Sequence, residues 1–210
     1  MFRQLIVAIA LPPLIAACSR QREAPESAAA RVPTTTVQAT SEAQPAEISF
    51  AQVLELQGVT FNVVSPNTVS ANTVTVSTSG LEIDNSAWSQ EVDGTVTGAE
   101  VADLNVDGSP EVYVYVMSIG ADAMGSVVTY VANNRKTLSM AFMAPLSDTP
   151  GAADGYLGKD EFAVLEGVLG RRFPIHDEVG APTGRIRQLQ YTLNAGEAGW
   201  ILKADRVLEF

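Results

Sequence analysis

The fold is decided by the stretch Glu111-Val112-Tyr113-Val114-Tyr115-Val116-Met117. Valine occupies every second position of its centre, and tyrosine or methionine occupies the positions between. Successive side chains of an extended strand point to opposite faces, so the valines share one face and the larger side chains share the other. Both faces are apolar, which is typical of a central strand that is covered on both sides.

Shorter β-branched or apolar runs lie on either side of this stretch, separated by Gly, Asn, Asp and Pro. They cover residues 59–64, 73–77, 81–83, 95–97, 126–132, 138–143, 187–193 and 199–207. Two further segments, residues 49–57 and 160–169, fit the apolar spacing of a short helix. For residues 48–210 the pattern predicts an all-β domain, an antiparallel β-sandwich or flattened barrel of about eight strands with one or two short helices.

The N-terminus is typical of an export signal followed by a lipid anchor. Arg3 supplies a positive charge, residues 5–17 form an apolar run too short to span a bilayer as a helix, and Ile15-Ala16-Ala17-Cys18 resembles a bacterial lipobox. We therefore interpret residues 1–18 as a lipoprotein signal peptide with Cys18 as the lipidated membrane anchor; an ordinary signal peptide is the alternative. Residues 19–47 are rich in Ala, Thr, Ser and Pro and predict a disordered tether. Ser19 favours, by resemblance, the outer membrane facing the periplasm.

Composition narrows the function classes. The chain has 210 residues, 46% of them hydrophobic, and a formal net charge of -11. This length and hydrophobic content predict one packed domain. The negative charge argues against a nucleic-acid partner, because phosphate binding needs clustered Lys and Arg. With one Cys and one His, the chain has no zinc site of the usual Cys/His kind. No convincing nucleophile and base occur together, so we expect no enzyme activity.

An acidic loop precedes the central strand. Asp103, Asn105 and Asp107 place oxygen side chains at alternate positions, a glycine takes the sixth position, and Glu111 follows. This spacing suits Ca²⁺ and resembles the calcium loops of some β-propeller repeats; an EF-hand would need glutamate where Val114 stands. The alternative is a polar turn in which the aspartates bond nearby backbone. No other cofactor is indicated.

Many short stretches in the folded part share their order and spacing with one family. They include Gly98-Ala99-Glu100-Val101-Ala102-Asp103-Leu104-Asn105 and Gly196-Glu197-Ala198-Gly199-Trp200. The others cover residues 56–61, 80–85, 113–116, 132–136, 160–164, 172–174, 182–184 and 187–191. Across residues 50–210 the chain resembles the periplasmic inhibitors of invertebrate-type lysozyme. The resemblance implies an antiparallel β-sandwich, a lysozyme partner and inhibition by occlusion of the active-site cleft; a homodimer is left open.

In that family the inhibitory loop follows the central strand and carries a Ser-Gly motif ending in tyrosine. The resemblance therefore implies a lysozyme-binding loop here that contains Ser118, Gly120, Ala121, Asp122, Ala123, Met124 and Gly125; a plain hairpin with glycines for its tight turns is the alternative. We further expect Arg135 at the rim of this loop, where it would pair with an acidic residue of lysozyme; an exposed hairpin residue is the alternative. Two positions depart from the family pattern. Met124 stands at the tyrosine position and cannot donate a hydrogen bond, and Asp122 adds a negative charge. These departures favour the alternative function, a non-inhibitory envelope lipoprotein that acts as a binding or structural module and is stabilised by calcium.

Overall fold

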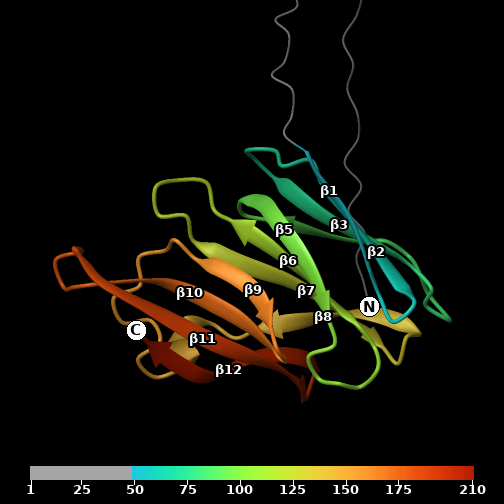
Figure 1. Ribbon diagram of the computed structural model, residues 1–210. Coiled ribbons are helices and arrows are strands. Elements are labelled where there is room, and N and C mark those ends of the chain that lie inside the picture. The colour runs from blue at the N-terminus through green and yellow to red at the C-terminus, as the bar shows by residue number, and fades with distance from the viewer. Residues whose placement is uncertain (1–48) are drawn as a thin grey trace, which may run out of the picture. The chain divides into compact units, whose positions relative to one another are not determined.

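The computed structural model describes residues 49–210, which form an all-β unit of two sheets (Figure 1). The smaller sheet has the order β1-β2-β3-β4, and the larger has the order β5-β6-β7-β8-β12-β11-β10-β9. The strands are β1 (Phe50–Leu56), β2 (Val59–Ser65), β3 (Asn72–Ser79), β4 (Trp88–Val92), β5 (Thr95–Ala102), β6 (Glu111–Met117), β7 (Gly125–Asn133), β8 (Thr137–Met143), β9 (Glu161–Leu165), β10 (Val168–His176), β11 (Pro182–Gly196) and β12 (Gly199–Glu209). The predicted fold class, an antiparallel sandwich or flattened barrel, is confirmed.

Strand β6 is central, as its two apolar faces predict. Val112, Val114 and Val116 are buried in a core that β6 shares with the smaller sheet, where Phe61 of β2 packs. Tyr113 and Tyr115 belong to a second core with residues of β10, β11 and β12. One strand therefore contributes to two cores, which explains why neither of its faces carries the polar residues of a solvated sheet.

The larger sheet curls until its edge strands approach each other. Its neighbouring strands pair antiparallel, except that β12 pairs with β8 in parallel. At the two edges, the backbone N–H of Val164 in β9 donates to Glu100 Oε2 of β5 at 2.7 Å. The carboxylate of Glu100 thus bridges strands that do not pair through their backbones, and the sheet encloses the second core.

The two predicted helices are wrong, because both segments form β-hairpins. In residues 49–57, exposure alternates along β1, and Gln57-Gly58, both with positive φ, makes a two-residue turn into β2. In residues 160–169, β9 is joined to β10 by the turn Glu166-Gly167. Leu165, which a helix would bury, is exposed on the outer face of the sheet. The apolar spacing in each segment fits a period of two as well as it fits a helix, and the X-Gly turns decide between them.

The predicted strand at residues 81–83 is also wrong. The backbone N–H groups of Glu82 and Ile83 donate to the carbonyls of Arg135 and Lys136 in the β7–β8 turn, and no ladder forms there. Cys18, the signal peptide of residues 1–18 and the tether of residues 19–47 lie outside the described residues. Among residues 49–210, no helix has the length and apolar character needed to cross a bilayer.

Candidate functional site

The predicted loop, residues 118–125, runs from the end of β6 to the first residue of β7, and its two ends are joined by Ser118. The backbone N–H of Ser118 donates to the Met124 carbonyl at 2.8 Å, and the Met124 N–H donates to Ser118 Oγ, also at 2.8 Å. Beyond the neck, Gly120 has φ 143° and Ala123 has φ 42°, so the tip uses backbone conformations that ordinary residues seldom adopt. The loop therefore has a fixed base and an exposed tip.

A second segment, residues 157–160, braces this loop from the side. The backbone N–H of Lys159 donates to the carbonyls of Asp122 and Ala123, at 2.8 and 3.0 Å. Gly158 lies against the Asp122 carbonyl so closely that a side chain there would collide with it, and its φ is 88°. Residues 118–125 and 157–159 together form one surface, which we call the two-loop surface.

A buried ion pair between Asp160 and Arg171 connects the segment 157–160 to the core. Asp160 Oδ2 accepts the N–H of Gly125 at 2.6 Å, and Asp160 Oδ1 accepts Arg171 Nε at 2.7 Å. Both side chains are almost completely buried, and the guanidinium lies 5.1 to 5.8 Å from the ring centroids of Tyr156, Phe162 and Phe173. Burial alone would lower the pKa of Arg171, but the hydrogen bond and charge of Asp160 outweigh it and raise that pKa.

Tyr156 completes this network. Its hydroxyl donates to Asp160 Oδ2 at 2.5 Å and accepts from Arg171 at 3.0 Å. Burial, followed by the bond to Asp160, raises the Tyr156 pKa to about 12. Asp160 therefore accepts from three groups at once, and one of them is the backbone of Gly125, the last residue of the predicted loop.

The tip of the two-loop surface is apolar with one charge of each sign. Ile119 is 56% exposed and Met124 48% exposed, and Leu157 of the second segment is 45% exposed. Asp122 and Lys159 are both exposed, and Lys159 forms no ion pair within residues 49–210. This combination of half-exposed apolar side chains and a free ammonium group can bind a partner surface that offers carboxylates.

The structure does not bring Arg135 to this surface. The 118–125 loop precedes β7, whereas Arg135 follows it in the turn to β8. Nine residues of extended strand separate the two, about 27 Å at the usual rise. Lys159, not Arg135, is the basic residue beside the loop, because the fold carries residues 157–159 to it from far along the sequence.

Three of the predicted calcium ligands, Asp103, Asn105 and Asp107, lie in the loop between β5 and β6. Asp103 accepts the N–H groups of Asp107 and Gly108, both at 3.0 Å, and the Gln57 side chain at 2.7 Å. Glu111, the first residue of β6, is completely buried. Within residues 49–210 no three Asp, Glu, His or Cys side chains converge on one point.

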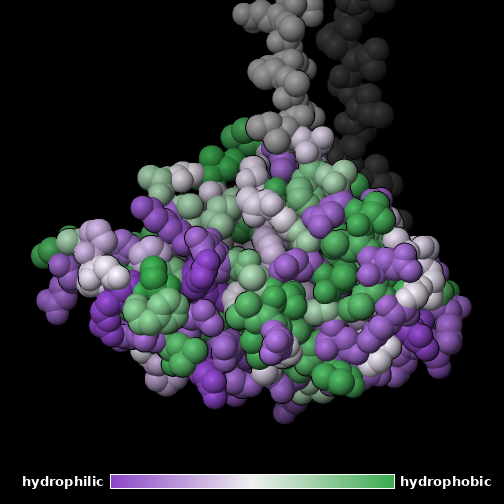
Figure 2. Space-filling view, in the orientation of Figure 1, coloured by the Kyte–Doolittle hydropathy of each residue, from purple (hydrophilic) through white to green (hydrophobic). Residues whose placement is uncertain are grey.

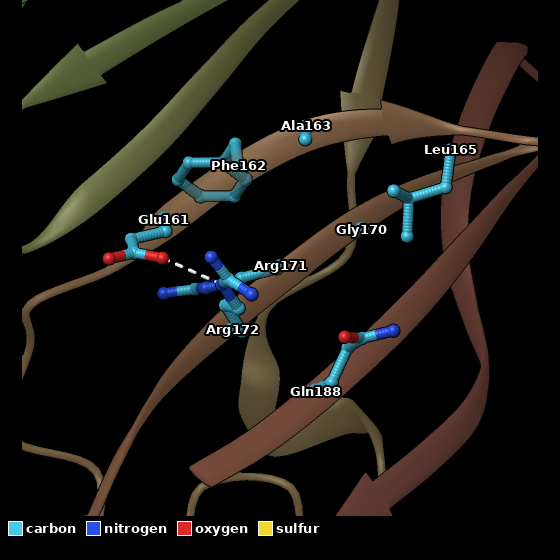
Figure 3. A pocket seen from close by; sticks show the side chains of 8 residues that line it. All are labelled: Glu161, Phe162, Ala163, Leu165, Gly170, Arg171, Arg172 and Gln188. Carbon is cyan, nitrogen blue, oxygen red and sulfur yellow. Dashed lines mark hydrogen bonds and ion pairs between the residues drawn. The ribbon is translucent and has the colours of Figure 1, made fainter.

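A small pocket lies over β9, β10 and β11 (Figure 3). Its volume is about 240 Å³, and Gly170 and Ala163 make the hollow. Glu161 and Arg172 line it and pair with each other at 2.6 Å. Ligand pockets are usually larger and offer free polar groups, so this pocket is a weaker candidate than the two-loop surface.

Sequence reasoning missed Gly158, Lys159, Asp160 and Arg171. The sequence signal that could have identified residues 155–160 as a turn is the pair of glycines Gly155 and Gly158. Both have positive φ in the structure, which a helix does not allow. The contact with the 118–125 loop spans 35 residues in sequence and leaves no local pattern.

Comparison of the chain with protein-family models, curated proteins and solved structures yields no match. Hydrophobic and hydrophilic residues are interspersed over the face shown in Figure 2. The geometry of the two-loop surface and the sequence pattern therefore carry the functional interpretation.

Proposed function

We propose that the chain is a lysozyme inhibitor that occludes the active-site cleft of an invertebrate-type lysozyme with the 118–125 loop. The observation that carries the proposal is the bracing of that loop. Its neck is closed by Ser118 and its flank is held by Lys159 and Asp160. A loop that is ordered before binding loses less entropy on docking, which favours affinity.

The charges of the two-loop surface fit this role in part. Glycoside hydrolases cleave with a pair of carboxyl groups in the cleft. The ammonium group of Lys159 would attract them, whereas Asp122 would repel them. The net charge of -11 favours encounter with a basic lysozyme. Recognition would thus combine long-range attraction to the whole enzyme with a local contact from Lys159.

The proposal includes anchoring of the chain through lipidated Cys18 at the outer membrane, facing the periplasm. Acyl chains contribute about 0.8 kcal/mol per buried methylene, so several chains hold a protein on a bilayer. An inhibitor fixed there would meet an incoming lysozyme before the enzyme reaches the cell wall. The role is one of binding and not of catalysis.

Lysis of cell-wall substrate by invertebrate-type lysozyme, with and without the purified protein, tests the proposal. The wild-type protein is expected to slow lysis, and Ile119→Ala combined with Met124→Ala to weaken inhibition, because these side chains are half exposed. Lys159→Ala should weaken inhibition and reduce its salt dependence, whereas the matched control Arg135→Ala, at the other end of β7, should not. Undiminished lysis in the presence of wild-type protein would overturn the proposal.

A second candidate function follows from Asp122 and Met124. Both are exposed at the loop tip, where the family pattern has neither an acid nor a methionine. This favours a non-inhibitory envelope lipoprotein that binds another partner or serves structure. Failure to inhibit lysozymes of the invertebrate, chicken and goose types, by protein shown to be folded, would favour it over inhibition.

A further inference from the structure

The loop between β5 and β6 is a stable turn by its own hydrogen bonds. Asp103 and Asn105 accept the N–H of Asp107, and Asp107 accepts the N–H of Ser109 at 2.8 Å. Such bonds are frequent in polar turns and need no ligand. They account for the three alternating side chains, but they do not account for Glu111.

Glu111 is buried without enough partners. Its side chain is completely inaccessible, and Oε2 accepts both the Leu104 N–H at 2.8 Å and the Tyr113 hydroxyl at 3.1 Å. Its other oxygen, Oε1, is buried with no partner at all. A buried polar atom without a partner calls for a specific explanation.

The carboxyl group of Glu111 is directed at the acidic loop. The N–H of Leu104, a residue of that loop, holds it there. Buried carboxylates are normally paired or coordinate a metal, and the groups that interact with Glu111 in the described part of the chain include no cation.

We propose that Asp103, Asn105, Asp107 and Glu111 form a Ca²⁺ site in which Glu111 Oε1 is a ligand. All four donors are oxygens, which suits a hard cation, and three carboxylates supply the charge. These carboxylates do not converge on one point in the described residues, so binding would draw them together around the ion. Asp103 Oδ1 and both carboxylate oxygens of Asp107 each accept one hydrogen bond, and Glu111 Oε1 accepts none, so each of these four oxygens keeps a lone pair for the ion.

The test is thermal unfolding and titration calorimetry of the purified protein, first stripped with chelator and then given Ca²⁺ or Mg²⁺. At Ca²⁺ about 100-fold above its Kd, the midpoint should rise by about 5 to 10 °C. Asp107→Asn should weaken binding about tenfold or more, because it removes a ligand charge and keeps the turn. The matched control is Asp177→Asn, since Asp177 also accepts N–H groups, from Val179 and Ala181, but lies outside the loop.

Glu111→Gln separates a metal ligand from a purely structural acid. In chelator this variant should be at least as stable as the wild type, because it removes a buried carboxylate that has no cationic partner among the described residues. With Ca²⁺ it should lose the rise in midpoint. If it fails to fold, Asp107→Asn against Asp177→Asn decides the question. The proposal is overturned if about 10 mM Ca²⁺, above the range of weak extracellular modules, gives no binding heat and no shift, or if Asp107→Asn binds as the wild type does.

Discussion

Replacing Asp160 with Asn tests whether the buried ion pair supports the two-loop surface. The side chain of Asp160 is 0% exposed and that of Arg171 is 9% exposed. An amide has only one acceptor oxygen, so the substitution would leave without an acceptor either Arg171 or both Gly125 and Tyr156. In either case the buried cation of Arg171 would lose its anionic partner. Breaking a buried pair from one side costs about 3–5 kcal/mol. With a urea m-value of about 2 kcal/mol/M, the unfolding midpoint should fall by roughly 1.5 to 2.5 M.

The neighbouring pair supplies the matched control. Glu161 of β9 and Arg172 of β10 each follow one member of the buried pair in sequence and pair with each other at 2.6 Å, but the side chain of Glu161 is 65% exposed and that of Arg172 is 57% exposed. Such a surface pair contributes about 0–1 kcal/mol, so Glu161→Gln should hardly move the urea midpoint. Adding Arg171→Met to Asp160→Asn should recover stability by removing the unpaired cation. Equal small losses for Asp160→Asn and Glu161→Gln would refute the reasoning.

Three further predictions follow from the loop, the tyrosines and the N-terminus. Met124→Tyr should strengthen lysozyme inhibition roughly two- to tenfold by restoring a hydroxyl donor, measured as the inhibition constant in the lysis assay; no change would argue against contact at the tip. Burial raises the pKa of all five tyrosines, so their contribution to the free energy of unfolding should be fully present below about pH 10 and be lost as the pH rises through the raised values. Tyrosinate absorbance should then rise only as circular dichroism reports unfolding. A tyrosinate signal at pH 10 from folded protein would contradict this burial. Cys18→Ser should leave the protein soluble or uncleaved, whereas unchanged membrane anchoring on fractionation would exclude lipidation.

The central strand was predictable because its sequence is apolar on both faces, as expected for a strand that is buried on both sides. Alternating valine and tyrosine have no helical reading, and the two cores lie where the two faces predict. Six further strands were predictable because each is a β-branched or apolar run that ends at turn residues: β2, β3, β7, β8, β11 and β12. Strands β1, β9 and β10 were missed because apolar residues three or four apart occur by chance in a half-buried strand.

The candidate site was predictable only in its first segment. The 118–125 loop follows directly from the position of β6, but Lys159 and Asp160 reach it through a contact that spans 35 residues. The sequence alone led us to expect Arg135 at the rim of this loop, but the length of β7 places Arg135 at the other end of that strand. Pairing within the sheet, not local propensity, decides which charges share a surface.

The two proposals concern opposite ends of one rigid strand. Glu111 begins β6, and Met117, immediately before the 118–125 loop, ends it, about 20 Å away at the rise of an extended chain. Between them β6 is paired with β5 and β7 and packed in both cores, so a change at Glu111 can reach the loop only by loosening the strand itself. The loop has its own support in Asp160 and Arg171, which contact neither Asp103 nor Glu111 through any hydrogen bond among the described residues. The proposed calcium site at one end should therefore affect how stably the sandwich is folded, whereas the ion pair at the other end should affect how firmly the proposed lysozyme-binding loop is held.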